Sequence, residues 1–117
     1  MLTELLLAKQ RISPDEVTGF DSTEFTHAAV AAYIASDMAD VGMGVQTAAE
    51  RFGLHFIPLV RERYFLAMNK RSRDESPMPQ VLQMLQSPSY RSSVAALGGY
   101  EAGETGRVLG VREAFGV

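Results

Sequence analysis

The sequence predicts an α/β fold in which helices flank a mixed, mostly parallel sheet. The first observation is that helix-like and strand-like segments alternate along the chain, an order that places parallel strands beside one another. The second is composition, since 46% of the 117 residues are apolar and 21% are charged, as in an average globular domain. A chain of this size has material for one modest core, so we expect one domain.

Three helices are expected in the first half of the chain. Leucines at helical spacing predict a helix over residues 2–10, and the sequence SPD that follows predicts a turn. Hydroxyl residues precede a second helix that begins near His27 and carries a stripe of alanines. A third helix is expected over residues 46–52, with Gly53 as its C-cap.

Four short apolar runs predict the strands, and three of them contain a glycine or a proline. These runs are VTGF, ADVGMG, LHFIPLV and YFLAM, at residues 17–20, 39–44, 54–60 and 64–68. Each is four to eight residues long, which suits a strand better than a helix.

The second half is expected to be helical after a polar loop over residues 69–77. The sequences PQVLQMLQ and PSYRSSVAAL each carry a proline near their start, where proline favours the first helical turn. Gly98-Gly99 ends the second of these helices, and the glycine-rich tail over residues 100–117 is expected to be partly irregular.

Composition and motifs exclude several function classes. The chain has no cysteine and a net charge of −3, which predicts neither thiol chemistry nor a nucleic-acid surface. His27 and His55 have no nucleophile or carboxylate at a recognisable spacing, and no phosphate-binding or metal-binding motif occurs. We therefore expect no enzyme, cofactor or metal. No signal peptide or membrane span is expected either, so the prediction is a cytoplasmic protein.

A binding site is the better-supported expectation. The backbone N–H groups at the start of a helix favour an anion, and Thr26 and His27 stand at such a start. Gly42 and Gly44 allow a close approach at the end of a predicted strand. Two simpler readings stay open, namely that Thr26 only caps the helix and that the glycines only form a tight turn.

A run of short motifs resembles a known family. The motifs are the TH helix start at residues 26–27, IASDMADVG, GLHFIPL, Glu62-Arg63-Tyr64 and LQSPSYRSSVAALGGY. Their order resembles the second half of the type 2 periplasmic-binding-protein (PBP) fold. It is most similar to the molybdate-related family whose PBP-like domains are often fused to a helix-turn-helix or a molybdopterin-biosynthesis domain.

The resemblance implies a single PBP-like fragment over residues 1–117. Residues 2–58 would form most of the second lobe, residues 60–106 would return to the first lobe, and residues 107–117 would be a tail. The ligand contacts that it implies are Thr26, His27, Gly42, Gly44, Val45 and Tyr64. Val45 stands where molybdate binders often have tyrosine, and Asp37 replaces a glycine that is usual at the end of the helix.

The resulting expectation is a domain that binds or senses a small oxyanion, molybdate or tungstate, in a molybdenum-related regulator or molybdopterin-biosynthesis protein. Two alternatives stay open: the effector-binding domain of a LysR-type transcription regulator, and an interaction module without a ligand. Because residues 64–68 and 78–97 would pack on absent first-lobe strands, Leu82, Leu85, Val94 and Leu97 are expected to favour a homo-oligomer.

Overall fold

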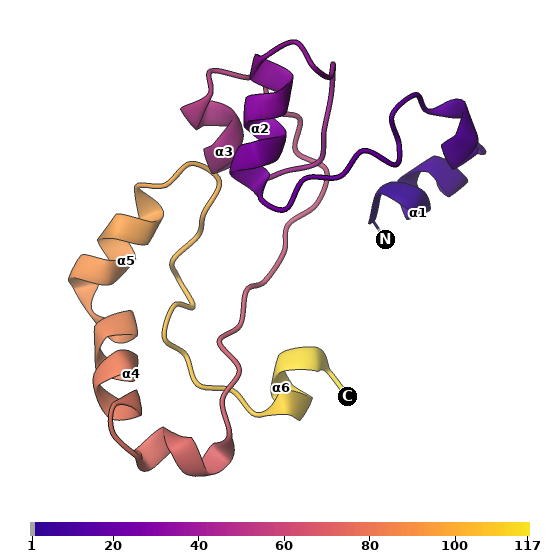
Figure 1. Ribbon diagram of the computed structural model, residues 1–117. Coiled ribbons are helices and arrows are strands. Elements are labelled where there is room, and N and C mark those ends of the chain that lie inside the picture. The colour runs from indigo at the N-terminus through magenta and orange to yellow at the C-terminus, as the bar shows by residue number, and fades with distance from the viewer. Residues whose placement is uncertain (1) are drawn as a thin grey trace. The chain divides into compact units, whose positions relative to one another are not determined.

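The computed structural model describes residues 2–117, and its regular elements are all helical (Figure 1). The helices are α1 (Leu2–Lys9), η1 (Pro14–Glu16), α2 (His27–Ala35), α3 (Gln46–Arg51), η2 (Lys70–Asp74), α4 (Met78–Gln86), α5 (Pro88–Ala95) and α6 (Val111–Phe115). The chain divides into two compact units, Met1–Pro58 and Leu59–Val117. Their assignment to the two lobes implied by the resemblance stays a prediction.

The expected α/β fold with a mixed, mostly parallel sheet is wrong, because none of residues 2–117 lies in a strand. Residues 17–20 form turns after η1. The other three strand-like segments have apolar sequences but no partner strand among residues 2–117. Residues 55–68, for example, exchange no backbone hydrogen bond with any part of the chain that the structure describes. A sheet exists only where two extended segments pair, so an apolar run is not sufficient.

The helices of the first unit begin and end where the sequence predicts. Helix α1 covers the leucine-rich start, and η1 forms the expected turn at Pro14. The Ser13 backbone N–H donates to Glu16 Oε2 at 2.7 Å and closes that turn. Helix α3 ends before Gly53, whose φ of 67° is the left-handed conformation that a glycine adopts without strain.

Helices α2 and α3 pack against each other and form the main contact of the first unit (Figure 1). Small alanine side chains on α2 permit this close approach, and Ala31 at 4% exposure is the one buried apolar residue that the described chain contains. Gly42 lies against the same helix. A Cβ built on it would be 2.6 Å from Val30 Cγ1 and 3.1 Å from Ile34 Cδ1, so only glycine fits there without a shift.

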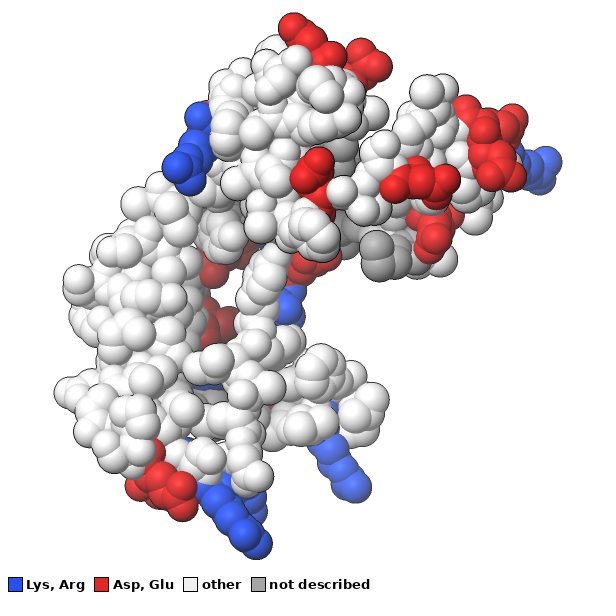
Figure 2. Space-filling model, in the orientation of Figure 1, with Lys and Arg blue, Asp and Glu red and all other residues white. Residues whose placement is uncertain are grey.

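The second unit is built from η2, α4 and α5, with α4 contacting both of the others. The two prolines fall in the first turns of α4 and α5, as predicted. Ser87 Oγ accepts from the Tyr90 N–H at 3.2 Å and caps α5. On the face drawn in Figure 2, the surface of α4 and α5 carries almost no charge. Within residues 2–117, no helix combines the length and apolar character that crossing a bilayer requires.

Candidate functional site

The start of α2 offers two backbone donors to solvent. Thr26, in extended conformation, caps the helix with its Oγ1, which accepts from the Ala29 N–H at 3.0 Å, and its carbonyl accepts from the Val30 N–H at 3.1 Å. The N–H groups of His27 and Ala28 have no acceptor within residues 2–117, and both residues are exposed. The positive end of the helix dipole lies at the same place.

The glycine segment passes along α2 toward this start. Gly42 lies over Val30, one turn into the helix, whereas a Cβ on Gly44 would lie 3.8 Å from His27 Nδ1. Val45 follows in extended conformation as the half-buried N-cap of α3. The structure therefore brings Gly44 beside His27, with Val45 next to it in the chain, and gives Gly42 a packing role against α2.

Tyr64, the sixth predicted contact, belongs to the second unit, where its side chain is 68% exposed. Partial desolvation, the negative charge of Glu62 and the neighbouring Tyr100 raise the pKa of the phenol above 10.0, and a hydrogen bond with Glu62 adds to this. The phenol is therefore neutral at pH 7, and its one O–H donates to the carboxylate of Glu62. Its participation in the site stays a prediction.

Carboxylates near the α2 site do not form a metal centre. No three His, Cys, Asp or Glu side chains converge on a metal-sized position in residues 2–117. Asp40 is exposed at a bend, not in the apolar strand that was expected. A hollow at η1 is lined by Glu4, Asp15 and Asp21 among others, but it is open and its acidic lining would repel an anion.

Asp37 follows α2 in the left-handed conformation, with φ of 57°. A Cβ makes this region unfavourable, and glycine is the residue that best relieves the crowding. We predict that Asp37→Gly raises the free energy of unfolding by about 0.5–1 kcal/mol. Chemical denaturation measures the change. Asp37→Ala removes the same carboxylate but keeps the Cβ, so we expect it not to raise the free energy of unfolding. If both variants raise that free energy equally, the cause is the lost charge and not the relieved backbone strain.

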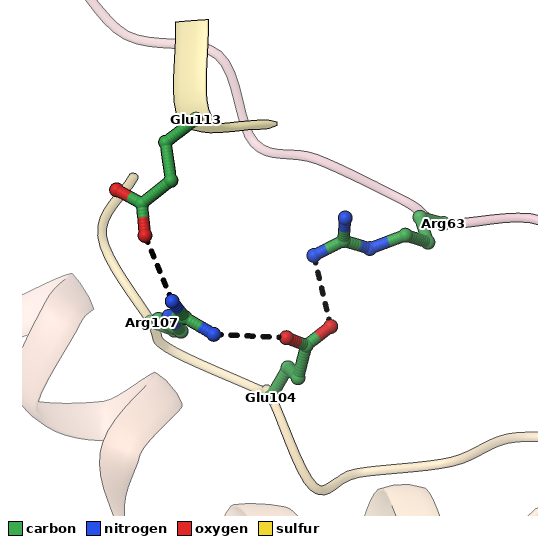
Figure 3. A network of polar contacts seen from close by, with 4 residues as sticks. All are labelled: Arg63, Glu104, Arg107 and Glu113. Atoms are coloured by element: carbon green, nitrogen blue, oxygen red, sulfur yellow. Dashed lines mark hydrogen bonds and ion pairs between the residues drawn. The ribbon is translucent and has the colours of Figure 1, made fainter. Parts of the chain in front are cut away.

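Sequence reasoning missed a charged network in the second unit (Figure 3). Arg63 Nη2 lies 2.9 Å from Glu104 Oε2, Arg107 Nη1 lies 3.1 Å from Glu104 Oε1, and Arg107 Nη2 lies 2.8 Å from Glu113 Oε1. Each side chain is more than half exposed. The sequence signal for this network is the alternation of charges in Arg61-Glu62-Arg63. The partners of the two arginines could not be predicted from it, because Glu101 and Glu104 lie about 40 residues away in the sequence.

The sequence of this chain is similar to a known domain family and to bacterial proteins. A family model described as a PBP superfamily domain matches residues 1–86. The uncharacterized protein YvgK of Bacillus subtilis (strain 168) is 34% identical over 98 residues, which cover 84% of this chain and 31% of that protein. An uncharacterized protein from the 5′ region of a ferredoxin 2Fe-2S gene in Clostridium pasteurianum is 31% identical over 103 residues, covering 84% of this chain and 88% of that protein.

The chain thus spans about a third of the Bacillus relative's length and most of the Clostridium relative's length. No solved structure matches it significantly. These matches confirm the PBP-like part of the resemblance over residues 1–86. The molybdate-related branch and its fusion partners are not tested by them.

Proposed function

Because the chain belongs to the PBP superfamily of domains, we propose that it supplies one wall of a binding site for a small oxyanion of the molybdate or tungstate kind. The observation that carries this proposal is the pair of unused backbone donors, the N–H groups of His27 and Ala28, at the positive end of α2. Groups of this kind hold a tetrahedral anion without a counter-charge.

The neighbouring residues suit such a ligand. Gly44 has no side chain, and a Cβ there would lie 3.8 Å from His27 Nδ1, so glycine at this position leaves more room for an anion beside the helix start than any other residue would. Recognition by neutral donors favours anions that carry several acceptor oxygens, because each oxygen can accept from a different N–H group. Molybdate and tungstate meet this condition, and so does sulfate, which makes sulfate the informative competitor.

Thermal denaturation in the presence of sodium molybdate, tungstate or sulfate tests the proposal, with sodium chloride at equal ionic strength as the control. A ligand that binds only the folded chain stabilises it by about 2.7 kcal/mol at a hundredfold excess over Kd. We expect molybdate and tungstate to raise the melting temperature above the chloride control, and the sulfate arm shows whether other tetrahedral oxyanions do the same. If no oxyanion exceeds the chloride control at millimolar concentration, the proposed ligand class is wrong.

An interaction module is a second candidate, favoured by the many exposed apolar side chains. Within the second unit, for example, Tyr64 is 68% exposed, Leu66 64% and Val60 57%. Side chains of this size are normally covered when they occur together. Under this reading the chain associates with a partner whether or not an oxyanion is present, and the titration above would show no stabilisation.

A further inference from the structure

Helix α6 has little support of its own. It spans five residues, whereas isolated helices shorter than about 12–15 residues are marginal in water. The backbone hydrogen bond at its end is local, since the Gly116 N–H donates to the Arg112 carbonyl at 2.9 Å. Val111 and Phe115 are 70% and 62% exposed, so docking of α6 buries little apolar surface. Contacts made by its side chains therefore decide whether the helix forms.

Glu113 holds one side of α6 through a chain of charges (Figure 3). Arg107 Nη2 lies 2.8 Å from Glu113 Oε1. The same guanidinium lies 3.1 Å from Glu104, measured from Arg107 Nη1 to Glu104 Oε1. Glu104 therefore orients the guanidinium that Glu113 binds.

Phe115 holds the other side of α6 through an aromatic contact. Its ring centroid lies 5.3 Å from that of Phe65. The guanidinium of Arg63 lies over the Phe65 ring, 5.2 Å from its centroid, in a cation–π contact. Arg63 Nη2 lies 2.9 Å from Glu104 Oε2. Glu104 therefore also orients the group that stacks on the docking surface of Phe115.

The two routes to α6 meet at Glu104. One oxygen of its carboxylate binds Arg63 and the other binds Arg107. The side chains of this network are all more than half exposed. Exposed ion pairs are individually weak and are screened by dissolved salt. A single carboxylate that solvent reaches thus supports both contacts of the short helix.

The chain next to Glu104 is fixed without these ion pairs. Gln86 Nε2 donates to the Gly106 carbonyl at 2.9 Å, and Arg91 Nη2 donates to the Thr105 carbonyl at 2.9 Å. Both acceptors are uncharged and belong to half-buried residues. Opening of the charged network therefore leaves residues 105–106 on α4 and α5, while α6 can leave.

We propose that α6 is a salt-sensitive lid over the Phe65 ring, and that Glu104 holds it closed. In the closed state Glu104 orients Arg63 and Arg107, and α6 is docked and helical. In the open state α6 leaves Phe65 and loses its helical structure, because docking and helix formation depend on the same contacts. Opening exposes the Phe65 ring and releases the guanidinium of Arg63 from Glu104.

The response of the natural chain to salt is the first test. The screening length falls from about 30 Å at 0.01 M salt to about 3 Å at 1 M. Over this range of sodium chloride, the amide N–H groups of Gly116 and Val117 should exchange with water about fivefold faster, the most that one exposed ion pair can contribute. The NMR signals of the Phe65 ring protons should shift as the Phe115 ring leaves. Amide exchange in α4 and α5 should stay within about twofold, since these helices remain folded.

Two matched substitutions test the role of Glu104. Glu104→Gln keeps the side-chain size but replaces one oxygen by an NH₂ group, which faces one of the two guanidinium groups in either orientation. At low salt it should speed exchange at Gly116 and Val117 by about fivefold, and added salt should then have little further effect. Glu101→Gln neutralises the partner of Arg61 in the same segment but lies on neither route to α6. It should leave exchange in α6 within about twofold of the natural chain.

Three results would overturn the lid. Exchange in α6 that does not respond to salt would mean that the contact between the rings holds the helix by itself. Equal effects of Glu104→Gln and Glu101→Gln would assign the change to net charge. Exchange that rises in α4 and α5 together with α6 would show that the second unit unfolds as a whole. All of these measurements are made without an oxyanion, so their outcome does not depend on the proposed function.

Discussion

Replacement of His27 by proline should weaken oxyanion binding by tenfold or more, while replacement by alanine should leave it within about threefold. Proline removes the backbone donor at the first position of α2, and a hydrogen bond to a charged acceptor contributes about 1.5–3 kcal/mol. Alanine removes only the imidazole. Isothermal titration with molybdate or tungstate measures both changes.

The helix itself should survive the proline. Proline fits the first turn of a helix, and the residue before it must be extended. Thr26 already is, with φ of −136° and ψ of 154°. Circular dichroism should therefore show unchanged helix content in both variants. Equal losses of affinity for alanine and proline would mean that the imidazole, not the backbone, contacts the anion.

Replacement of Gly106 by alanine should destabilise the second unit by about 2–4 kcal/mol. Gly106 has a φ of 79°, and a Cβ there would lie 2.6 Å from Gln86 Cγ, 2.9 Å from Gln86 N and 3.0 Å from Leu85 C. Two of these atoms are backbone, so the neighbouring chain must move to admit a methyl group. Left-handed strain adds on the order of 1 kcal/mol.

The same substitution should detach residues 100–110 from the end of α4. Gln86 Nε2 donates to the Gly106 carbonyl at 2.9 Å, and the shift forced by the Cβ breaks this bond. Denaturant titration and amide hydrogen exchange over residues 100–110 measure the effect. Gly103→Ala is the uncrowded control in the same segment, because Gly103 does not have a positive φ and no atom lies within 4 Å of its added Cβ. It should change stability by less than about 1 kcal/mol, and similar losses for both variants would refute the crowding argument.

Local sequence determines the positions of only some of the residues predicted for the candidate site. The cap at Thr26 and the position of His27 at the start of α2 follow from hydroxyl residues placed before an alanine-rich helix. The approach of Gly44 to His27 depends on how the intervening chain turns back after Asp37. That turn brings together residues about 17 positions apart, and no local pattern encodes it.

The sequence by itself determined the helices of this protein. Helical hydrogen bonds join residues four apart, so local sequence is sufficient to set where helices begin and end. The local signals are the apolar spacing, the caps Thr26 and Ser87, and the glycine that follows α3. Tertiary structure alone decided that residues 54–60 and 64–68 are not strands, because a strand requires a ladder of hydrogen bonds from a second extended segment, and no part of residues 2–117 forms such a ladder with them. Tertiary structure likewise decided which carboxylates pair with Arg61 and Arg63. Glu101 and Glu104 lie about 40 residues further along the chain. Opposite charges so far apart in sequence attract each other only when the folded chain brings them close in space.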